Sequence, residues 1–107
     1  MATFYALGRY TSQGYQGFCT DPKSDRAQAA KTAAEAVGAK LVSYTGLRGA
    51  HDLMAVFGGT VVHGAAVKMA TEASGALCDI AVCEAININE VAENAAKIAG
   101  AYKGPGK

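Results

Sequence analysis

The order of strand-like and helix-like segments along this 107-residue chain constrains its fold more than any single residue does. Runs rich in aromatic and β-branched residues predict strands over residues 3–11, 40–47, 51–57 and 77–85. Apolar residues at helical spacing predict three helices, from Ser24 to Gly38, from Thr60 to Gly75, and from Asn87 or Asn89 through Tyr102. Between the first strand and the first helix, the glycines and proline of residues 12–22 predict a loop.

Two strand–helix–strand units joined by a hairpin predict one architecture. It is the split βαβ arrangement, an α+β ferredoxin-like βαββαβ sandwich with its helices on one face, here followed by an extra C-terminal helix. We expect strands 3–11 and 77–85 to form the central pair and the hairpin to supply the other strands. The helix over 60–75 is expected to turn its apolar stripe to the core, namely Val62, Ala65, Ala66, Met69, Ala70 and Ala73.

Both faces of the predicted sheet are apolar. Leu53, Ala55 and Phe57 point one way in their strand, while Met54 and Val56 point the other. The first two predicted helices cover only one face of the sheet, so the other face must be covered by a different part of the chain or by another molecule. The C-terminal helix of the same chain is one candidate. The sheet of a second copy is the other, and we favour it because a contiguous apolar face is rarely left to water. We therefore expect a homodimer or a larger homo-oligomer.

Length and charge exclude several classes of protein. The length predicts a single domain over residues 1–102 with a flexible tail at 103–107. Ten Lys and Arg nearly balance nine Asp and Glu, which argues against nucleic-acid binding. No apolar run approaches the ~20 residues that span a bilayer, and the N-terminus lacks the pattern of a secretory signal, so we expect a cytoplasmic protein without a membrane partner.

The three cysteines, Cys19, Cys78 and Cys83, do not form a CxxC pair and predict neither a disulfide framework nor a zinc site. Cys78 and Cys83 are five residues apart on one predicted strand and are therefore expected on opposite faces. Buried thiols are the favoured interpretation, with Cys19 in its loop the most accessible. We expect no intrinsic metal and no cofactor, because too few ligating side chains converge.

Two short motifs resemble those of a known family. The segment Leu7-Gly-Arg-Tyr-Thr-Ser-Gln-Gly14 resembles the "Y-T-x-Q-G" opening of GYD-domain proteins, which are small bacterial proteins of uncharacterised activity. The stretch Gly49-Ala-His-Asp-Leu53 resembles the turn after which the family is named, with His51 in place of its tyrosine. The resemblance covers roughly residues 3–98 and implies a ferredoxin-like relative of the dimeric α/β-barrel type. It implies no catalytic residues.

Five residues near the predicted hairpin are candidates for a site. His51 is the candidate general base, because an imidazole titrates near neutral pH. The candidate ligand-binding residues are Arg48, Tyr44, Tyr10 and Asp52. Each also has a structural interpretation: Asp52, beside a turn, is typical of a carboxylate that accepts backbone N–H groups. His51 and Asp52 are neighbours on a predicted strand, so they are not expected to pair.

Three functions remain open at this stage. The first is a homo-oligomeric module that binds a small, partly apolar molecule at the sheet face or the subunit junction. The second is an enzyme of the dimeric α/β-barrel type, acting on a small organic substrate with His51 as base. The third is a structural or assembly subunit. We favour the first, because the sequence offers no second catalytic group beside His51.

Overall fold

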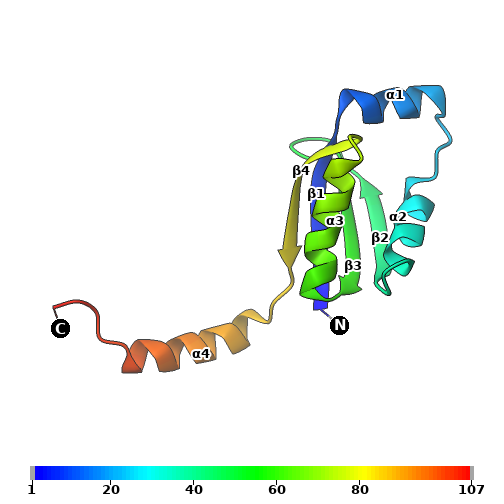
Figure 1. The fold of residues 1–107 in the computed structure, drawn as a ribbon. Helices are drawn as coiled ribbons and strands as arrows, with labels where there is room; N and C mark the ends of the chain where they lie inside the picture. The colour runs from blue at the N-terminus through cyan, green and yellow to red at the C-terminus, as the bar shows by residue number, and fades with distance from the viewer. Residues whose placement is uncertain (1, 107) are drawn as a thin grey trace.

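The computed structural model describes residues 2–106 of the chain. In chain order, the described elements are β1 (Ala2–Tyr10), α1 (Ser12–Thr20), α2 (Arg26–Glu35), β2 (Lys40–Gly46), β3 (Leu53–Gly59), α3 (Val61–Ala73), β4 (Leu77–Glu84) and α4 (Ile88–Ala101) (Figure 1). Among these residues, no helix combines the length and the apolar character needed to cross a membrane.

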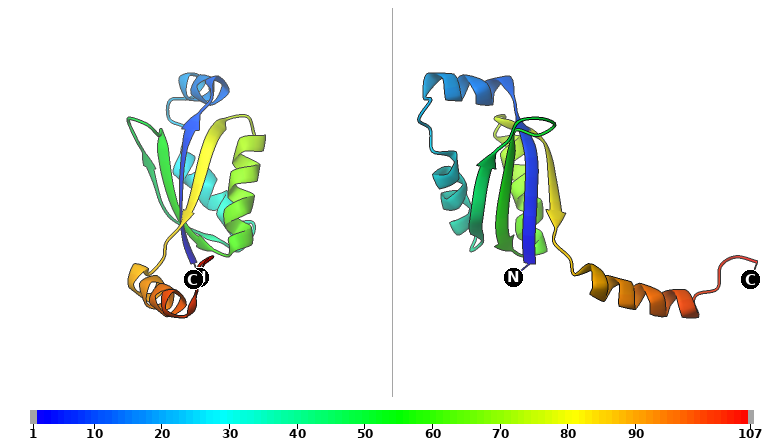
Figure 2. Two further views of the ribbon diagram at one scale, coloured as in Figure 1. Left: turned by 90° about the vertical axis from the view of Figure 1, so that its left-hand side faces the viewer. Right: turned by 180° about the vertical axis from the view of Figure 1, so that it is seen from behind.

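The four strands form one antiparallel sheet in the order β2-β3-β1-β4. Both α2 and α3 lie on the same face of this sheet (Figure 2). The predicted ferredoxin-like α+β fold is thereby confirmed. The predicted central pair is wrong, because β3 and not β4 is the second central strand. The crossover through α2 leaves a space between β1 and β2, and the hairpin brings β3 into that space. The crossover through α3 then carries β4 to the other side of β1.

The core lies on the helix-covered face of the sheet. Its buried cluster consists of Phe4, Ala6, Ala55, Phe57 and Ile80. Phe4 and Phe57 are directly opposite each other on β1 and β3, and their rings stack with centroids 5.5 Å apart. A Cβ built at Gly64 of α3 would lie only 3.1 Å from the Phe4 ring. The absent side chain at Gly64 thus lets α3 approach the core closely.

The face that α3 turns to the sheet differs from the predicted one. Gly64 is buried and Val67 packs against the core, whereas Val62 and Met69 are 73% and 76% exposed. Because α3 sits closest to the sheet at Gly64, the stripe of Val62, Ala66, Met69 and Ala73 lies about half a helical turn away and points outward.

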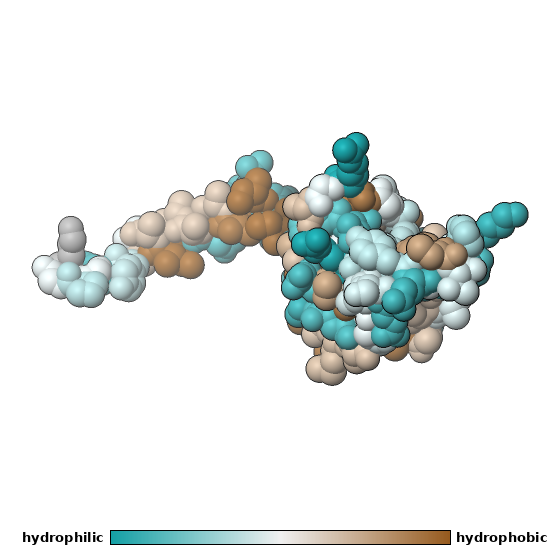
Figure 3. Space-filling model, turned by 90° about the horizontal axis from the view of Figure 1, so that it is seen from above, coloured by the Kyte–Doolittle hydropathy of each residue, from teal (hydrophilic) through white to brown (hydrophobic). Residues whose placement is uncertain are grey.

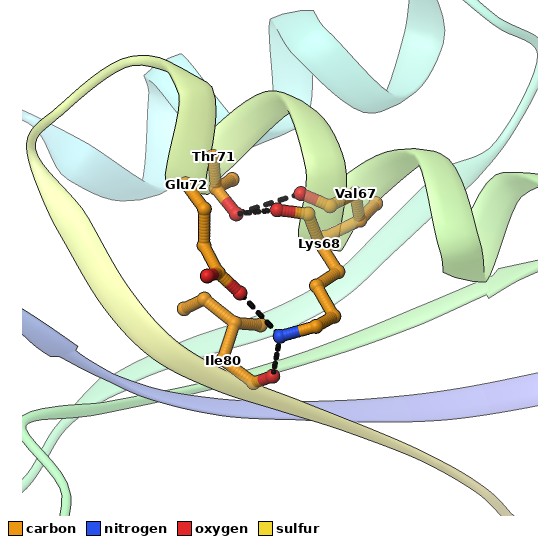
Figure 4. A network of polar contacts seen from close by, with 5 residues as sticks. All are labelled: Val67, Lys68, Thr71, Glu72 and Ile80. Atoms are coloured by element: carbon orange, nitrogen blue, oxygen red, sulfur yellow. Dashed lines mark hydrogen bonds and ion pairs between the residues drawn. The ribbon is translucent and has the colours of Figure 1, made fainter.

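A polar bridge also sets the orientation of α3. The Lys68 ammonium donates to the carbonyl oxygen of Ile80 in β4 at 2.8 Å and forms an ion pair with Glu72 one turn along α3 (Figure 4). The Thr71 hydroxyl donates back to the Val67 carbonyl at 2.6 Å. The bridge ties α3 to the edge strand β4, so the face that carries Lys68 is held towards the sheet.

Residues 12–20, predicted as part of a loop, form the helix α1. Its N-cap is Thr11, whose hydroxyl accepts the Gly14 N–H at 3.2 Å and donates to the Gly75 carbonyl at 2.5 Å. The Thr11 N–H donates to the Ala76 carbonyl at 3.0 Å. These bonds tie the start of α1 to the turn between α3 and β4. Two glycines lower the local helix propensity, and tertiary anchoring offsets that cost.

The predicted C-terminal helix is confirmed as α4, with Asn87 as its N-cap. It projects away from the sheet and does not cover its open face (Figures 1 and 2). The molecule therefore measures 63 Å along its longest axis but only 29 and 22 Å along the others. Of the two candidates for covering the open face, the C-terminal helix of the same chain is therefore excluded in this structure. Flexibility of the tail at 103–107 stays a prediction, and Lys107 lies outside the described residues.

Candidate functional site

Three of the five predicted site residues meet at one end of the sheet. The hydroxyls of Tyr10 and Tyr44 are 2.5 Å apart, which joins the end of β1 to β2 on the helix-covered side. The Tyr10 N–H donates to a carboxylate oxygen of Asp52 at 3.0 Å. The same oxygen accepts the Tyr15 hydroxyl of α1 at 2.8 Å. We call Tyr10, Tyr15, Tyr44 and Asp52 the tyrosine–aspartate cluster.

Helix α1 covers this cluster through aromatic contacts. The Phe18 ring meets the Tyr10 ring edge-on with centroids 5.0 Å apart, and the Tyr15 ring lies 6.0 Å from Tyr10. Neither Tyr15 nor Phe18 is among the five predicted site residues. The Tyr15 hydroxyl is a candidate from sequence like those of Tyr10 and Tyr44, but packing is the favoured role for such aromatic residues. The one sequence signal for this helix is Thr11, a good N-cap residue directly after a strand.

The electrostatics of the cluster follow from its hydrogen bonds. Two hydrogen bonds to the ionised carboxylate lower the pKa of Asp52. The larger effect comes from the Tyr15 hydroxyl and the smaller from the Tyr10 N–H. The bond to Asp52 in turn raises the pKa of Tyr15. Burial, followed by the bond to Tyr10, raises the pKa of Tyr44. At neutral pH the cluster therefore combines an ionised carboxylate with protonated Tyr15 and Tyr44, an arrangement suited to holding α1 and the hairpin together.

We expect acid to weaken the contribution of Asp52 to stability. Its folded-state pKa lies below the unfolded value of about 3.9, so the ionised carboxylate stabilises the fold above that pH. This stabilisation is lost as the pH falls through the depressed folded-state pKa. Asp52→Asn should therefore melt at a lower temperature than the wild type at neutral pH, and the difference should shrink in acid.

Thermal melts followed by circular dichroism from neutral pH down to about pH 2 measure this effect. Asp21→Asn is the control, because the Asp21 side chain makes no hydrogen bond within residues 2–106. A difference between wild type and Asp52→Asn that stays constant across the pH range would contradict the expectation.

His51 and Arg48 lie outside the cluster. His51 precedes β3, which begins at Leu53, so it is not on the strand as expected. Its Nδ1 atom is buried and has no hydrogen-bond partner among residues 2–106. Arg48 lies in the exposed turn between β2 and β3, where the described part of the chain offers it neither a hydrogen bond nor an ion pair. The structure thus brings Tyr10, Tyr44 and Asp52 together, whereas His51 forms no ion pair with a carboxylate within residues 2–106.

His63, the other histidine of the chain, also lies outside the cluster. It is used in the N-cap of α3, where its Nδ1 accepts the Thr60 N–H at 3.1 Å. Within residues 2–106, no group of three or more His, Cys, Asp or Glu side chains is placed to hold a metal ion. The cluster is therefore a hydrogen-bonded junction and has no metal-binding geometry.

The second candidate surface is the open face of the sheet, opposite α2 and α3. Tyr5 pairs with Val56 and Leu7 pairs with Met54 across β1 and β3, so these four side chains form one apolar patch. Arg9 of β1 lies on the same face and is exposed. The predicted two-sided character of β3 is confirmed, because Leu53, Ala55 and Phe57 are buried on the other side.

Two cysteines share this open face, which corrects the prediction that they diverge. Cys83 is opposite Tyr5 and Cys78 is opposite Arg9. The pairing of β1 with β4 shifts between these positions, and Asp79 adopts a left-handed φ of 53°. The extra residue of this β-bulge reverses the alternation of the strand. All three thiols are unbridged, as predicted, but none is buried: Cys19 and Cys83 are exposed and Cys78 is half-buried.

Comparison with known proteins agrees with the sequence motifs. A family model described as the GYD domain matches residues 4–95. No curated protein and no solved structure matches the chain. The matched region extends from β1 into α4 and includes the tyrosine–aspartate cluster, the hairpin and the open sheet face. Since the model spans most of the 107 residues, the chain belongs to the GYD-domain family.

Proposed function

We propose that this protein is a homo-oligomeric binding module. Two copies pack their open sheet faces together, and the junction between them holds a small, partly apolar molecule. One observation supports this most directly: the apolar patch of Tyr5, Leu7, Met54 and Val56 lies across the two central strands without any helix over it (Figure 2). Contiguous apolar patches on soluble proteins commonly mark interaction or ligand sites.

The chemistry of the patch suggests the class of ligand. Tyr5 and Val56 provide apolar contact area, and the Tyr5 ring also carries a hydroxyl. Arg9 is exposed on the same face and forms no ion pair within the described residues, so it is placed to receive an acidic group. A small molecule with an apolar body and an anionic end fits these features. Tyr10 and Tyr44 face the core side and do not line this junction.

An enzymatic role is the second candidate, and the buried Nδ1 of His51 favours it. A buried polar atom without a partner is costly, so a bound molecule that hydrogen-bonds to Nδ1 would be stabilised. His51 would then act as a proton acceptor towards that molecule. This second candidate would be supported if the His51→Ala protein no longer retained the bound molecule while its oligomer mass stayed that of the wild type.

Sedimentation equilibrium at micromolar concentration tests the proposed association. We expect the wild type to exceed its monomer mass of 10.9 kDa, and Val56→Lys to shift it towards smaller species, because a charge would be buried at the junction. Ala33→Lys, on the exposed surface of α2, is the matched control and should behave like the wild type. Native mass spectrometry should detect a bound small molecule that Val56→Lys loses.

Two outcomes would refute the proposal. The first is a wild-type mass that stays at 10.9 kDa throughout the micromolar range. The second is a Val56→Lys protein that retains both the wild-type mass and the bound molecule.

A further inference from the structure

Helix α4 is a capped helix that projects from the body of the molecule. The last ladder bond beside β4 runs from the Ala85 N–H to the Thr3 carbonyl at 2.8 Å. Two residues later, the Asn87 side chain accepts the N–H groups of Asn89 and Glu90 and caps the helix. Every residue of α4 is exposed, and the helix runs away from the sheet (Figure 1).

The sequence of α4 is that of a packed helix. Its large apolar side chains, Ile88, Val91 and Ile98, form one stripe together with Ala95, and the C-cap residue Tyr102 continues it. Glu93 and Lys97 lie on the opposite side, while Glu90 flanks the stripe. Hydrophobic side chains lie along the projecting helix in the space-filling view (Figure 3). An isolated helix of 14 residues is marginal in water, so α4 needs a surface that covers its stripe.

The surface area of the chain indicates how much is left to cover. The chain exposes 7464 Å², about 1,900 Å² more than the roughly 5,600 Å² of a typical folded monomer of 10.9 kDa. Its radius of gyration of 18.0 Å likewise exceeds the about 13 Å expected for a compact chain of this length. A standard protein interface needs about 800 Å² from each partner. The excess is therefore sufficient for a stable association.

Helix α3 carries a second apolar stripe that faces solvent. It consists of Val62, Ala66, Met69 and Ala73, on the side opposite Gly64. A surface helix normally has charged or polar residues there, and a helix that is apolar on both sides is normally buried on both. The outward stripe of α3 thus has the properties of an interface.

We propose that α4 is an arm that packs along the outward stripe of α3 in a second copy of this chain. The two stripes match in spacing, because apolar positions recur in alternating steps of three and four residues in both. They match in length, since helices of 13 and 14 residues are both about 20 Å long. They match in size, because Ile88, Val91 and Ile98 are large where Ala66 and Ala73 leave room.

The α3 of the same chain is not the receiver. The capped junction at Asn87 directs α4 away from the body, and the two helices are apart in all three ribbon views (Figures 1 and 2). The arm contact is independent of the proposed sheet–sheet junction, because the two use different residues.

Cross-linking of full-length protein tests the arm contact. Equal amounts of unlabelled and ¹⁵N-labelled protein are mixed, unfolded, refolded together and treated with an amine-reactive cross-linker. We expect mixed-label links between Lys97 of α4 and Lys68 of α3. Ile98→Asp on the arm and Met69→Asp on the receiving stripe should each abolish these links. Both side chains are exposed in the single chain, at 65% and 76%, so neither substitution removes a core contact.

Mixing an arm variant with a receiving-stripe variant shows which chain provides α4 and which provides α3. When Ile98→Asp and Met69→Asp proteins are mixed, links should return in one direction only, from Lys97 of the Met69→Asp chain to Lys68 of the Ile98→Asp chain. Glu93→Gln, on the polar side of α4, is the control and should retain the links. Val56→Lys should retain them as well, which separates the arm contact from the sheet–sheet junction.

Three results would overturn the proposal. Links confined to a single label would place α4 on the α3 of its own chain. Links between two Lys97 residues, without any to Lys68, would mean that α4 pairs with another α4. Lys68–Lys97 links that persist in both Ile98→Asp and Met69→Asp would show that the apolar stripes do not form the contact.

Discussion

Replacing Phe57 by alanine is expected to lower the free energy of unfolding by about 3–5 kcal/mol, because it removes an aromatic side chain from the core and leaves a cavity. Phe57 is 3% exposed, and its ring stacks on that of Phe4. A domain of this size has only about 5–15 kcal/mol of stability in total. The loss should therefore leave a large fraction of Phe57→Ala unfolded at modest denaturant concentration. Urea unfolding followed by circular dichroism measures it.

The matched control for Phe57 is Val42 in β2. Val42 is 63% exposed, and the pairing of β2 with β3 is irregular between Leu41 and Ser43. Val42→Ala should change the free energy of unfolding by no more than about 0.5 kcal/mol, as is usual for surface positions. If both variants lost a similar amount of stability, the core would not be centred on the stacked phenylalanines.

Gly14→Ala is expected to destabilise the protein by about 1–3 kcal/mol, because the added methyl group has no room. A Cβ at Gly14 would lie 2.4 Å from the Ala76 carbonyl oxygen, which is backbone and cannot rotate away as a side chain can. Either α1 or the turn before β4 must then move, and the bonds of Thr11 to that turn would be strained. Urea unfolding gives the stability, and hydrogen exchange shows whether α1 opens locally.

Gly17 provides a control within the same helix. Nothing lies within 4 Å of a Cβ built at Gly17, so Gly17→Ala should only improve helix propensity. That gain is about 0.5–1 kcal/mol. Opposite signs for the two substitutions would confirm that close packing, and not propensity, decides the result at Gly14. Equal stabilisation by both would mean that α1 is not held against the turn.

The packing of Gly14 also gives a structural meaning to the family motif. Within Tyr10-Thr-Ser-Gln-Gly14, Thr11 caps α1 and bonds to Gly75, and Tyr10 bonds to both Tyr44 and Asp52. The motif therefore joins three parts of the fold: the hairpin, α1 and the turn between α3 and β4. A structural role of this kind accounts for its residue types without any chemistry on a substrate.

The site was only partly predictable from the sequence. Aromatic and acidic residues near strand ends indicated Tyr10, Tyr44 and Asp52, and these do meet. Helix α1, which positions Tyr15, was not predicted, because its start is held by contacts with residues more than 60 positions away, such as the bond of Thr11 to Gly75. Local propensity contains no information on such contacts. For the same reason, the bulge at Asp79, which places Cys78 and Cys83 on one face, left no signal in the alternation of β4.

The sequence by itself determined the order of every element except α1, the Thr60 cap of α3 and the two-sided apolar character of β3, because periodicity and capping are local properties of the chain. Only the tertiary structure decided that β3 joins β1 at the centre of the sheet while β4 takes an edge, and that Gly64 and Lys68 turn the apolar stripe of α3 outward. Only the structure shows that α4 leaves the open face uncovered. These features depend on which surfaces meet in space, and an apolar stripe in a sequence does not specify whether its own sheet or a second chain will cover it.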